Sequence, residues 1–510
     1  MNATSEISSM SEYLLCTLTD AEQARVAFLS FNQWNFTTAA LMDTALSAHA
    51  AGIQVKVAFW ADSTPLQDSG WTTSSALARV SGSRTLCDSA RHSLRSHGLP
   101  ESTFVKPPLK RWKPEDLPAV PKILTRSNIR KLTYLGAPMG RSILQVHPDF
   151  NTPIRNDYVW PRRWIVAAAG SYAWVFDQTQ ALIRAHGLTA VVVYNGRFMH
   201  DQAAAAAATS LGIQVLYYDN GGLDTGFDLT VASTHDWSHL QNRMIDLFSR
   251  FSDPTHEDFQ IDFEETSVQW FLNRQGHTEP GIELFLGEQR HGHLGDLPDA
   301  EQLVVFFSSS GDEIVELDLN WAEHLESQEE AVRDLASACA QRPGTKLVVR
   351  THPHMRIKPA DDLARWTEMV EGAGVDLHID PHSPVDSYAL MRAADVVFTY
   401  GSTSGVEAAF FGRPVVIMGP SAYDRLGFGK KISTESEIGP CLDNPPDPNS
   451  TAALPYGLMM HRRGFNYERV SRGPAGEILV KGVPVPEASS LARKLSDWYR
   501  NKRFIWLTAK

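Results

Sequence analysis

The sequence predicts an α/β protein made of two doubly wound lobes, each a mostly parallel sheet covered by helices. Short apolar runs alternate with helical patterns along most of the chain, which is the order of repeated βα units. The clearest apolar runs are continuous, as strands buried on both faces are. The chain has 510 residues, which is long for one hydrophobic core, so two or three domains are expected.

The start of the chain has the strand–helix–strand order of a doubly wound lobe. The expected elements are a weakly ordered lead-in (residues 1–20), a strand (25–31), a loop (32–36), a helix that ends at Gly52, and a second strand (53–59). Ligands of such sheets gather at the carboxyl ends of the strands. Asn32 is therefore a candidate acceptor contact, and the alternative is a polar turn with a packing tryptophan.

The rest of the first lobe supplies further polar residues at strand ends. The expected elements are an irregular segment (61–125), a turn before a helix (136–142), a long helix (164–186), a strand (189–194), an alanine-rich helix that ends at Leu211, and a strand (214–218). Asn195 and Arg197 follow the first of these strands, and Asp201 opens the alanine-rich helix. We predict that all three bind an acceptor; a salt bridge between Arg197 and Asp201 is the alternative.

The second lobe repeats the alternation of strands and helices. It is expected to contain strands near 302–307, 346–350, 375–379 and 396–398, with helices near 321–340, 361–371 and 387–393. The predicted domains are residues 1–297, residues 298–485 and a C-terminal helix within 486–510. Residues 420–485 are rich in proline and glycine and are expected to be irregular.

A turn rich in glycine and hydroxyl groups follows the last of these strands. Ser402, Thr403 and Ser404 lie between two glycines, Gly401 and Gly405, at the start of a short helix. Free backbone N–H groups of a first helical turn bind anions, and glycine allows close approach of a ligand. Ser404 and Glu407 have the spacing of a capping box, so capping alone is the alternative. We predict donor binding by the residues from Ser402 to Gly405 and by Glu407.

A basic cluster ends the strand near residues 346–350. If the extended run continues, Arg350, His352 and His354 share one side of it. Arginine pairs with phosphate, and histidine donates hydrogen bonds or moves protons near neutral pH. We predict that Arg350 and His354 bind the donor and that His352 is catalytic. A surface loop that contains two histidines is the alternative.

A small-residue loop follows the first strand of the second lobe. Ser308, Ser309 and Ser310 are suited to close backbone approach and are predicted to bind the donor. Asp312 and Glu313 come next and are candidate catalytic carboxylates, with Asp201 as a further candidate for the general base. The alternative for Asp312 and Glu313 is that they only stabilise the helix that follows.

Two of these motifs resemble a known family. The run R-T-H-P-H at 350–354, followed by Y-G-S-T-S-G-V-E-A-A-F-F-G-R-P-V-V-I at 400–417, is similar to the C-terminal domain of bacterial capsule and lipopolysaccharide glycosyltransferases of the GT-B fold. The nearest similarity is to capsule polysaccharide biosynthesis proteins. This group includes the Kdo transferases, and sialyltransferases with a His-Pro motif are more distant. Residues 191–198, residues 304–313 and the pair Trp321 and Gln328 resemble the same group, whereas the first 150 residues match it only loosely.

The resemblance implies a transferase that uses a nucleotide sugar and needs no metal, and it favours a CMP-linked donor. It implies that His352 and the turn from Ser402 to Ser404 contact the nucleotide phosphate. It also implies that the C-terminal helix crosses back to the first lobe and that the acceptor is a glycan or glycolipid. The alternatives are a CDP-glycerol-type phosphotransferase, a nucleotide-sugar epimerase and a non-catalytic subunit of a polysaccharide assembly complex.

Composition limits the kinds of partner that the protein is expected to bind. A net charge of −12 argues against nucleic-acid binding and gives no broad basic surface for anionic lipid. The four cysteines form neither a metal cluster nor an evident disulfide framework, and we expect a cytoplasmic protein. No apolar stretch is long enough to span a bilayer, so membrane contact at the inner face of the inner membrane would be peripheral or through an assembly complex. His291 and His293 lack a matching ligand set, so no metal site is expected.

Overall fold

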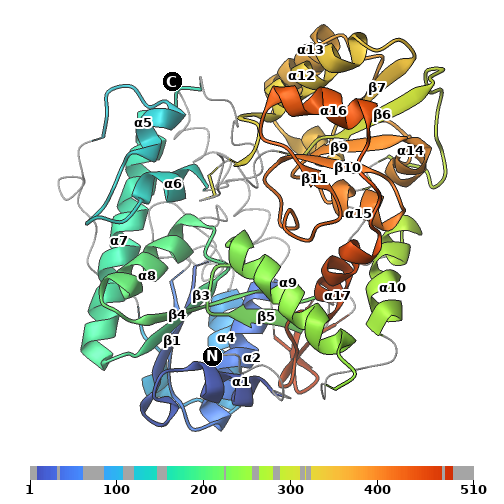
Figure 1. Cartoon of the computed structure of the whole chain (residues 1–510). Helices are drawn as coiled ribbons and strands as arrows, with labels where there is room; N and C mark the ends of the chain where they lie inside the picture. The colour runs from blue at the N-terminus through green and yellow to red at the C-terminus, as the bar shows by residue number, and fades with distance from the viewer. Residues whose placement is uncertain are drawn as a thin grey trace. The chain divides into compact units, whose positions relative to one another are not determined.

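The computed structural model describes most of the chain. The described residues are 9–31, 35–60, 86–106, 120–145, 158–222, 226–255, 263–278, 286, 288–310, 316–317, 323–473 and 477–485. They form two compact units, each with its own sheet (Figure 1). The predicted class, two doubly wound α/β lobes, is confirmed by these sheets.

The boundaries of the two units differ from the predicted ones. The first unit contains described residues up to 235 and again from 463, and the second contains described residues between 236 and 462. The chain thus changes unit near residue 235 rather than 297, because the helices α9 (Trp237–Ser252) and α10 (Phe263–Gln275) pack against α17 (Leu454–Arg462). It returns at residue 463, before the predicted C-terminal helix, which lies outside the described residues.

The first unit is built on a six-stranded sheet with the order β12-β5-β4-β3-β1-β2. Its strands are β1 (Arg25–Ser30), β2 (Gln54–Phe59), β3 (Ala190–Tyr194), β4 (Gln214–Asn220), β5 (Gly226–Thr230) and β12 (Phe465–Asn466). The strands β1 to β4 pair in parallel, whereas β5 and β12 are antiparallel additions that were not predicted. The predicted parallel strands of this lobe are therefore confirmed, whereas the antiparallel edge of the sheet was not expected from the sequence.

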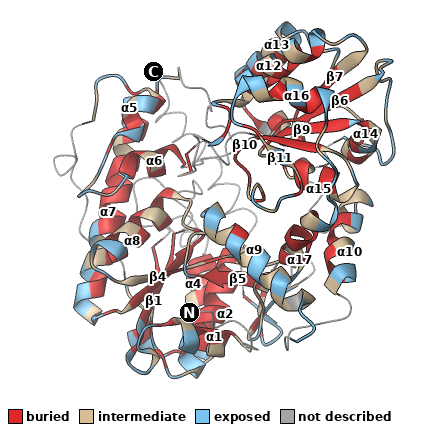
Figure 2. Cartoon of the chain, in the orientation of Figure 1, coloured by how far each residue is buried: buried red, intermediate tan, exposed pale blue. Residues whose placement is uncertain are grey.

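Helices cover both faces of this sheet. They are α1 (Met10–Thr17), α2 (Asn35–Ala50), α4 (Leu86–Ser96), α5 (Arg126–Arg130), α6 (Met139–Leu144), α7 (Arg162–His186) and α8 (Met199–Ser210). Helix α1 falls in the expected lead-in and α4 in the expected irregular segment, so both expectations were wrong there. Helix α1 buries Met10 and Leu14 against the core, and α4 buries Leu86 and Leu94. Buried positions are red in Figure 2. In both helices, burial of an apolar face stabilises a segment whose polarity suggested a loop.

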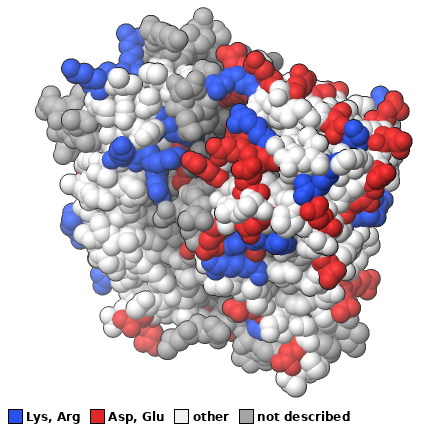
Figure 3. Space-filling model, turned by 45° about the horizontal axis from the view of Figure 1, so that its top comes forward, with Lys and Arg blue, Asp and Glu red and all other residues white. Residues whose placement is uncertain are grey.

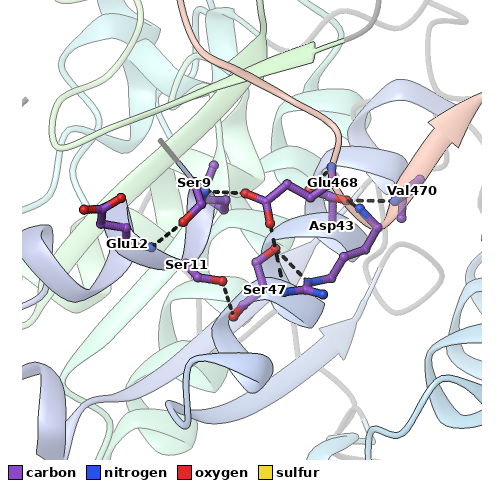
Figure 4. Close-up of polar contacts among 9 residues, drawn as sticks. Ser9, Ser11, Glu12, Asp43, Ser47, Glu468 and Val470 are labelled. Atoms are coloured by element: carbon purple, nitrogen blue, oxygen red, sulfur yellow. Dashed lines mark hydrogen bonds and ion pairs between the residues drawn. The ribbon is translucent and has the colours of Figure 1, made fainter. Parts of the chain in front are cut away.

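The returning chain is fixed to the first unit through Asp43 of α2. The Asp43 carboxylate is buried and accepts hydrogen bonds from the backbone N–H groups of Glu468, Arg469 and Val470, at 3.3, 2.6 and 2.8 Å (Figure 4). A small antiparallel sheet follows, made of β13 (Val470–Arg472), β14 (Ile478–Val480) and β15 (Val483–Pro484). This part of the predicted irregular insert is therefore ordered.

The second unit is built on a fully parallel sheet with the order β11-β10-β9-β6-β7-β8. Its strands are β6 (Gln302–Phe307), β7 (Thr345–Arg350), β8 (Leu377–Ile379), β9 (Val396–Tyr400), β10 (Val415–Gly419) and β11 (Lys430–Lys431). Successive residues of β6 alternate between two cores: Val305 and Phe307 lie in one, and Val304 and Phe306 in the other. A strand buried on both faces explains the continuous apolar run in the sequence.

Different helices cover the two faces. Helices α10, α14 (Ser387–Ala393), α15 (Ser404–Phe410) and α17 contribute to the core that contains Phe307. Helices α12 (Gln328–Ala340), α13 (Ala360–Gly372) and α16 (Ile438–Asp443) contribute to the core that contains Phe306. Among the described helices of the chain, none is both long and apolar enough to cross a bilayer.

Candidate active site

Three predicted motifs meet at one edge of the second sheet. Strand β6 lies between β7 and β9, and Phe307 at its end is level with Arg350 of β7 and Thr399 of β9. All three strands are parallel, so Ser308, Thr351 and Gly401 leave the sheet at its carboxyl edge. Neighbouring strands lie about 4.8 Å apart, which separates the His352 loop from the Ser402 turn by roughly 10 Å. This edge is where doubly wound sheets bind ligands.

The serine loop after β6 is hydrogen-bonded to the histidine loop. Ser308 is buried, its N–H donates to the carbonyl of Arg350 at 3.1 Å, and its Oγ accepts from the N–H of His352 at 2.8 Å. The N–H of Ser309 donates to Oε1 of Gln328 at 2.6 Å, at the start of α12. Ser310 is also buried. The predicted donor-binding serines therefore form a fixed loop beside His352.

His352 lies where the strand gives way to a turn. Its Nδ1 accepts a hydrogen bond from the backbone N–H of His354 at 3.1 Å, so the neutral ring carries its proton on Nε2. Pro353 begins a short 3₁₀-helix, η5 (Pro353–Ile357), because its fixed φ suits a first helical position. The predicted extended run that would align Arg350 with His352 and His354 is wrong, since it ends at Arg350. His354 is instead held near His352 by the turn, with 6.3 Å between ring centres.

A buried chain of hydrogen bonds supports the histidine loop from below. Thr351 is fully buried, and its Oγ1 accepts from Nε1 of Trp366 in α13 at 2.7 Å. The same hydroxyl lies 2.8 Å from Nε2 of His378 in β8 and can donate its proton there. Burial lowers the pKa of His378, although Glu371 and Asp380 oppose this effect. A neutral His378 is the acceptor that the Thr351 hydroxyl needs.

Arg350 lies beneath the sheet edge and not on its surface. It is 1% exposed, and its Nη1 donates to the carbonyl of Asp380. Its Nε and Nη2 have no hydrogen-bond partner among the described residues. Burial lowers the pKa of Arg350 to about 10, partly opposed by Asp380 and Asp386, so the side chain is still a cation at neutral pH. It can act on a bound anion by its field, whereas the predicted direct pairing with phosphate is not supported by its burial.

The hydroxyl turn after β9 is built on two glycines. Gly401 has a φ of 74°, which favours glycine. A Cβ at Gly405 would lie 2.7 Å from the Thr399 methyl group and 2.7 Å from the Tyr423 hydroxyl. Ser402 Oγ lies 3.3 Å from Ser404 Oγ and 3.4 Å from the Ser404 N–H. Thr403 is the residue that precedes α15, and it makes no side-chain cap bond.

Glu407 does not form a capping box with Ser404. Its buried carboxylate forms an ion pair with Arg274 of α10 and accepts a hydrogen bond from the Tyr388 hydroxyl at 2.9 Å. Arg274 also lies 4.9 Å from the ring centre of Trp270. The alternative interpretation, in which Ser404 and Glu407 only cap the helix, is therefore wrong, because the carboxylate joins α15 to α10 and α14. Donor binding by Glu407 stays a prediction.

In the first unit, two predicted acceptor residues shape the end of β3. The side-chain carbonyl of Asn195 accepts from the N–H of Arg197 at 2.9 Å, and its main-chain carbonyl accepts from Ser233 Oγ at 2.7 Å. Asp201 is 1% exposed and accepts from the N–H of Tyr194 at 3.0 Å. Asn195 and Asp201 thus organise this edge, and burial speaks against Asp201 as a general base. Arg197 is half-buried at the same edge.

Thr234, His235 and Arg463 also lie near this edge, and the sequence did not single them out. The hydroxyl of Thr234 donates to Asp219 at 2.8 Å and lies 3.3 Å from Nδ1 of His235. Burial lowers the pKa of His235 to about 3, and Arg197 and Arg463 add to the effect. Burial also raises the pKa of Asp219, opposed first by Arg463. The polar run after β5 signals Thr234 and His235, but Arg463 comes from a distant segment that only the fold brings here.

Some predicted site residues have no described position. Asn32, Asp312, Glu313 and Trp321 lie outside the described residues, so their roles stay predictions. Within the described part of the chain, no group of three or more His, Cys, Asp or Glu side chains could hold a metal ion.

Comparison with known proteins supports the family resemblance in the second unit. Residues 315–468 match the model of the capsule polysaccharide biosynthesis protein family. These residues include the His352 loop and the Ser402 turn. A search of curated protein sequences gave no match.

Solved structures with similar arrangements have low sequence identity to this chain. The KpsC β-Kdo 2,4-transferase of Thermosulfurimonas dismutans is 14% identical, with 61% of this chain and 88% of that chain covered and a TM-score of 0.35. The β-Kdo 2,7-transferase of the same organism is 15% identical, with 63% and 89% covered and a TM-score of 0.34. The UDP-GlcNAc 2-epimerase of Neisseria meningitidis is 11% identical, with 86% and 97% covered and a TM-score of 0.28. Because these TM-scores are below 0.5, the fold assignment depends on the strand orders given above.

Proposed function

With the capsule polysaccharide biosynthesis match over residues 315–468 as premise, we propose that this protein is a glycosyltransferase. It would move a sugar from a nucleotide-sugar donor to a glycan or glycolipid acceptor of a cell-surface polysaccharide, capsule or lipopolysaccharide. The observation that carries the proposal is the shared sheet edge, where Ser308 bonds the His352 loop beside the Ser402 turn. Catalysis in this proposal depends on charge stabilisation at the leaving phosphate.

In the proposed reaction, the acceptor oxygen attacks the anomeric carbon as the bond from that carbon to the phosphate oxygen breaks. The electron pair of the broken bond goes to the leaving phosphate. Nε2–H of His352 donates a hydrogen bond to this phosphate, and the turn from Ser402 to Ser404 supplies hydroxyl and N–H donors. The buried Arg350 cation adds a favourable field from beneath, where low polarity strengthens it. The acceptor proton leaves to a base for which Asp312 and Glu313 remain candidates.

The role proposed for His352 depends on its tautomer. The N–H of His354 donates to Nδ1, which leaves Nε2 as the donor in the neutral ring. The proposed enzyme therefore needs no proton transfer from this histidine, and activity should not require a protonated imidazole. We also propose that fixed donors replace a metal ion at the phosphate.

Transfer assays test the proposal. The purified protein is incubated with CMP- or UDP-linked sugars and capsule oligosaccharide acceptors, and products are identified by mass spectrometry. We expect a glycosidic product, and His352→Ala should lower kcat by about 10²- to 10³-fold, the usual cost of one donor to developing charge. His49→Ala is the matched control, because His49 is an exposed histidine in the last turn of α2, outside the predicted site. Unchanged turnover in His352→Ala would remove the assigned role, and a phosphodiester product would identify a phosphotransferase instead.

A further inference from the structure

One surface of the first unit has a charge that contrasts with the whole chain. The chain carries a net charge of −12, yet the described residues 120–145 and 158–176 contain no Asp or Glu. Six exposed residues of this region are here called the basic apolar surface: Lys122, Ile123, Arg130, Lys131, Val159 and Arg162. The left side of the view in Figure 3 shows Lys and Arg atoms among uncharged ones, with some Asp and Glu atoms at its lower edge.

Backbone contacts bring the two segments of this surface together. Thr125 pairs with Val159 in an antiparallel bridge, and the N–H of Trp160 donates to the carbonyl of Leu124 at 2.8 Å. The guanidinium of Arg162 donates to the carbonyl of Pro121 at 3.0 Å. The segment that contains Lys122 and Ile123 is thus fixed beside the segment that contains Val159 and Arg162.

Two aliphatic side chains project from this basic region. Ile123 is 62% exposed and Val159 is 57% exposed, although both flank buried neighbours of the core, Leu124 and Trp160. Neither side chain is needed to fill the hydrophobic core, so polar residues at both positions would lower the stability of the fold only slightly. Exposed aliphatic groups beside cations are the pattern of a surface that enters the interface of an anionic bilayer.

We propose that the basic apolar surface binds an anionic lipid bilayer and holds the protein at a membrane as a peripheral protein. The cations would face lipid phosphates, and Ile123 and Val159 would enter the boundary between headgroups and acyl chains. An acidic soluble glycan is a less suitable occupant, because it would make no use of the two aliphatic side chains. The proposal does not depend on the proposed reaction, since binding requires neither donor nor acceptor.

Vesicle flotation with the full chain tests this proposal. Wild-type protein should float with vesicles of phosphatidylcholine and phosphatidylglycerol, should stay in solution with phosphatidylcholine alone, and should be released by 0.5 M salt. Lys122→Glu with Lys131→Glu should lower the bound-to-free ratio at least about tenfold, since each basic residue near an anionic surface contributes several-fold. Ile123→Ser should lower the ratio about threefold or more at unchanged charge.

The matched control changes charge elsewhere by the same amount. Lys430→Glu with Arg472→Glu alters two exposed cations outside the basic apolar surface, and it should bind nearly as wild type does. Thermal melts of all variants verify that the fold is retained. Absence of wild-type flotation, equal losses in both double variants, or an Ile123→Ser variant that binds as wild type does would each overturn the proposal. The last result, together with displacement by soluble heparin, would point to an acidic glycan.

Discussion

Thr351→Val removes one hydroxyl group from beneath the proposed phosphate site and leaves the side-chain shape unchanged. In the wild type, Thr351 Oγ1 is 2.7 Å from Trp366 Nε1 and 2.8 Å from His378 Nε2, and Thr351 is 0% exposed. Valine would leave both ring nitrogens without this partner in a buried place. Each buried polar group that loses its partner costs about 1–3 kcal/mol, so the second unit should lose about 2–5 kcal/mol of unfolding free energy.

Urea denaturation at pH 7.5, followed by tryptophan fluorescence, measures this loss. Thr351→Ser is the matched control, because serine keeps the hydroxyl group and should retain most of the stability. The loss should also reach the site, since Thr351 directly precedes His352, and amide exchange in η5 should become faster. A valine variant within about 0.5 kcal/mol of wild type would refute the reasoning, because two buried hydrogen bonds would then contribute almost nothing.

Three further predictions concern stability. Asp43→Ala leaves the N–H groups of residues 468–470 without their acceptor and should cost about 2–5 kcal/mol, with faster amide exchange there; protected amides would contradict this. Burial raises the pKa of Asp424, but hydrogen bonds from His324 and Gln241 together with the Lys431 charge outweigh it, so the pKa is lowered. The stability from this group is full above the unfolded pKa and is lost as pH falls below about 4, so acid unfolding should be flatter in Asp424→Asn, and an equal slope would contradict this. Gly405→Ala should cost about 1–3 kcal/mol in a thermal melt, whereas Gly372→Ala, whose Cβ meets nothing within 4 Å, should be neutral or stabilising.

Much of the second sheet could be predicted because its strands are locally encoded. The runs that became β6, β7 and β9 are apolar throughout, and parallel topology then places their carboxyl ends together. The Ser308 loop, the His352 loop and the Ser402 turn could therefore be predicted from the sequence to lie at strand ends of one sheet edge.

The parts that could not be predicted depend on partners far away in the sequence. Ser404 and Glu407 have capping-box spacing, but Arg274, 133 residues earlier, pairs with the carboxylate instead. Strand β5 is short, contains glycine and aspartate, and is formed by pairing with β4 and β12. The same holds for α9 and α10, which join the second unit only because α17 returns beside them.

The basic apolar surface could not be predicted from the sequence for a different reason. A net charge summed over the whole chain hides a local excess of cations, and exposure of Ile123 and Val159 is a property of the fold. Sequence composition alone therefore argued against the surface that we now propose for anionic lipid.

Binding of nucleotides by the intact protein tests the central claim most directly, that three strand ends of the second sheet hold the donor phosphate. The shift in melting temperature is measured with CMP, CDP, UDP, GDP and dTDP, since a ligand of the native state at 100 times its Kd stabilises by about 2.7 kcal/mol. The account predicts that at least one nucleotide raises the melting temperature of wild type, and that His352→Ala and Ser402→Ala each reduce this shift. No shift with any nucleotide, or an undiminished shift in both variants, would contradict it.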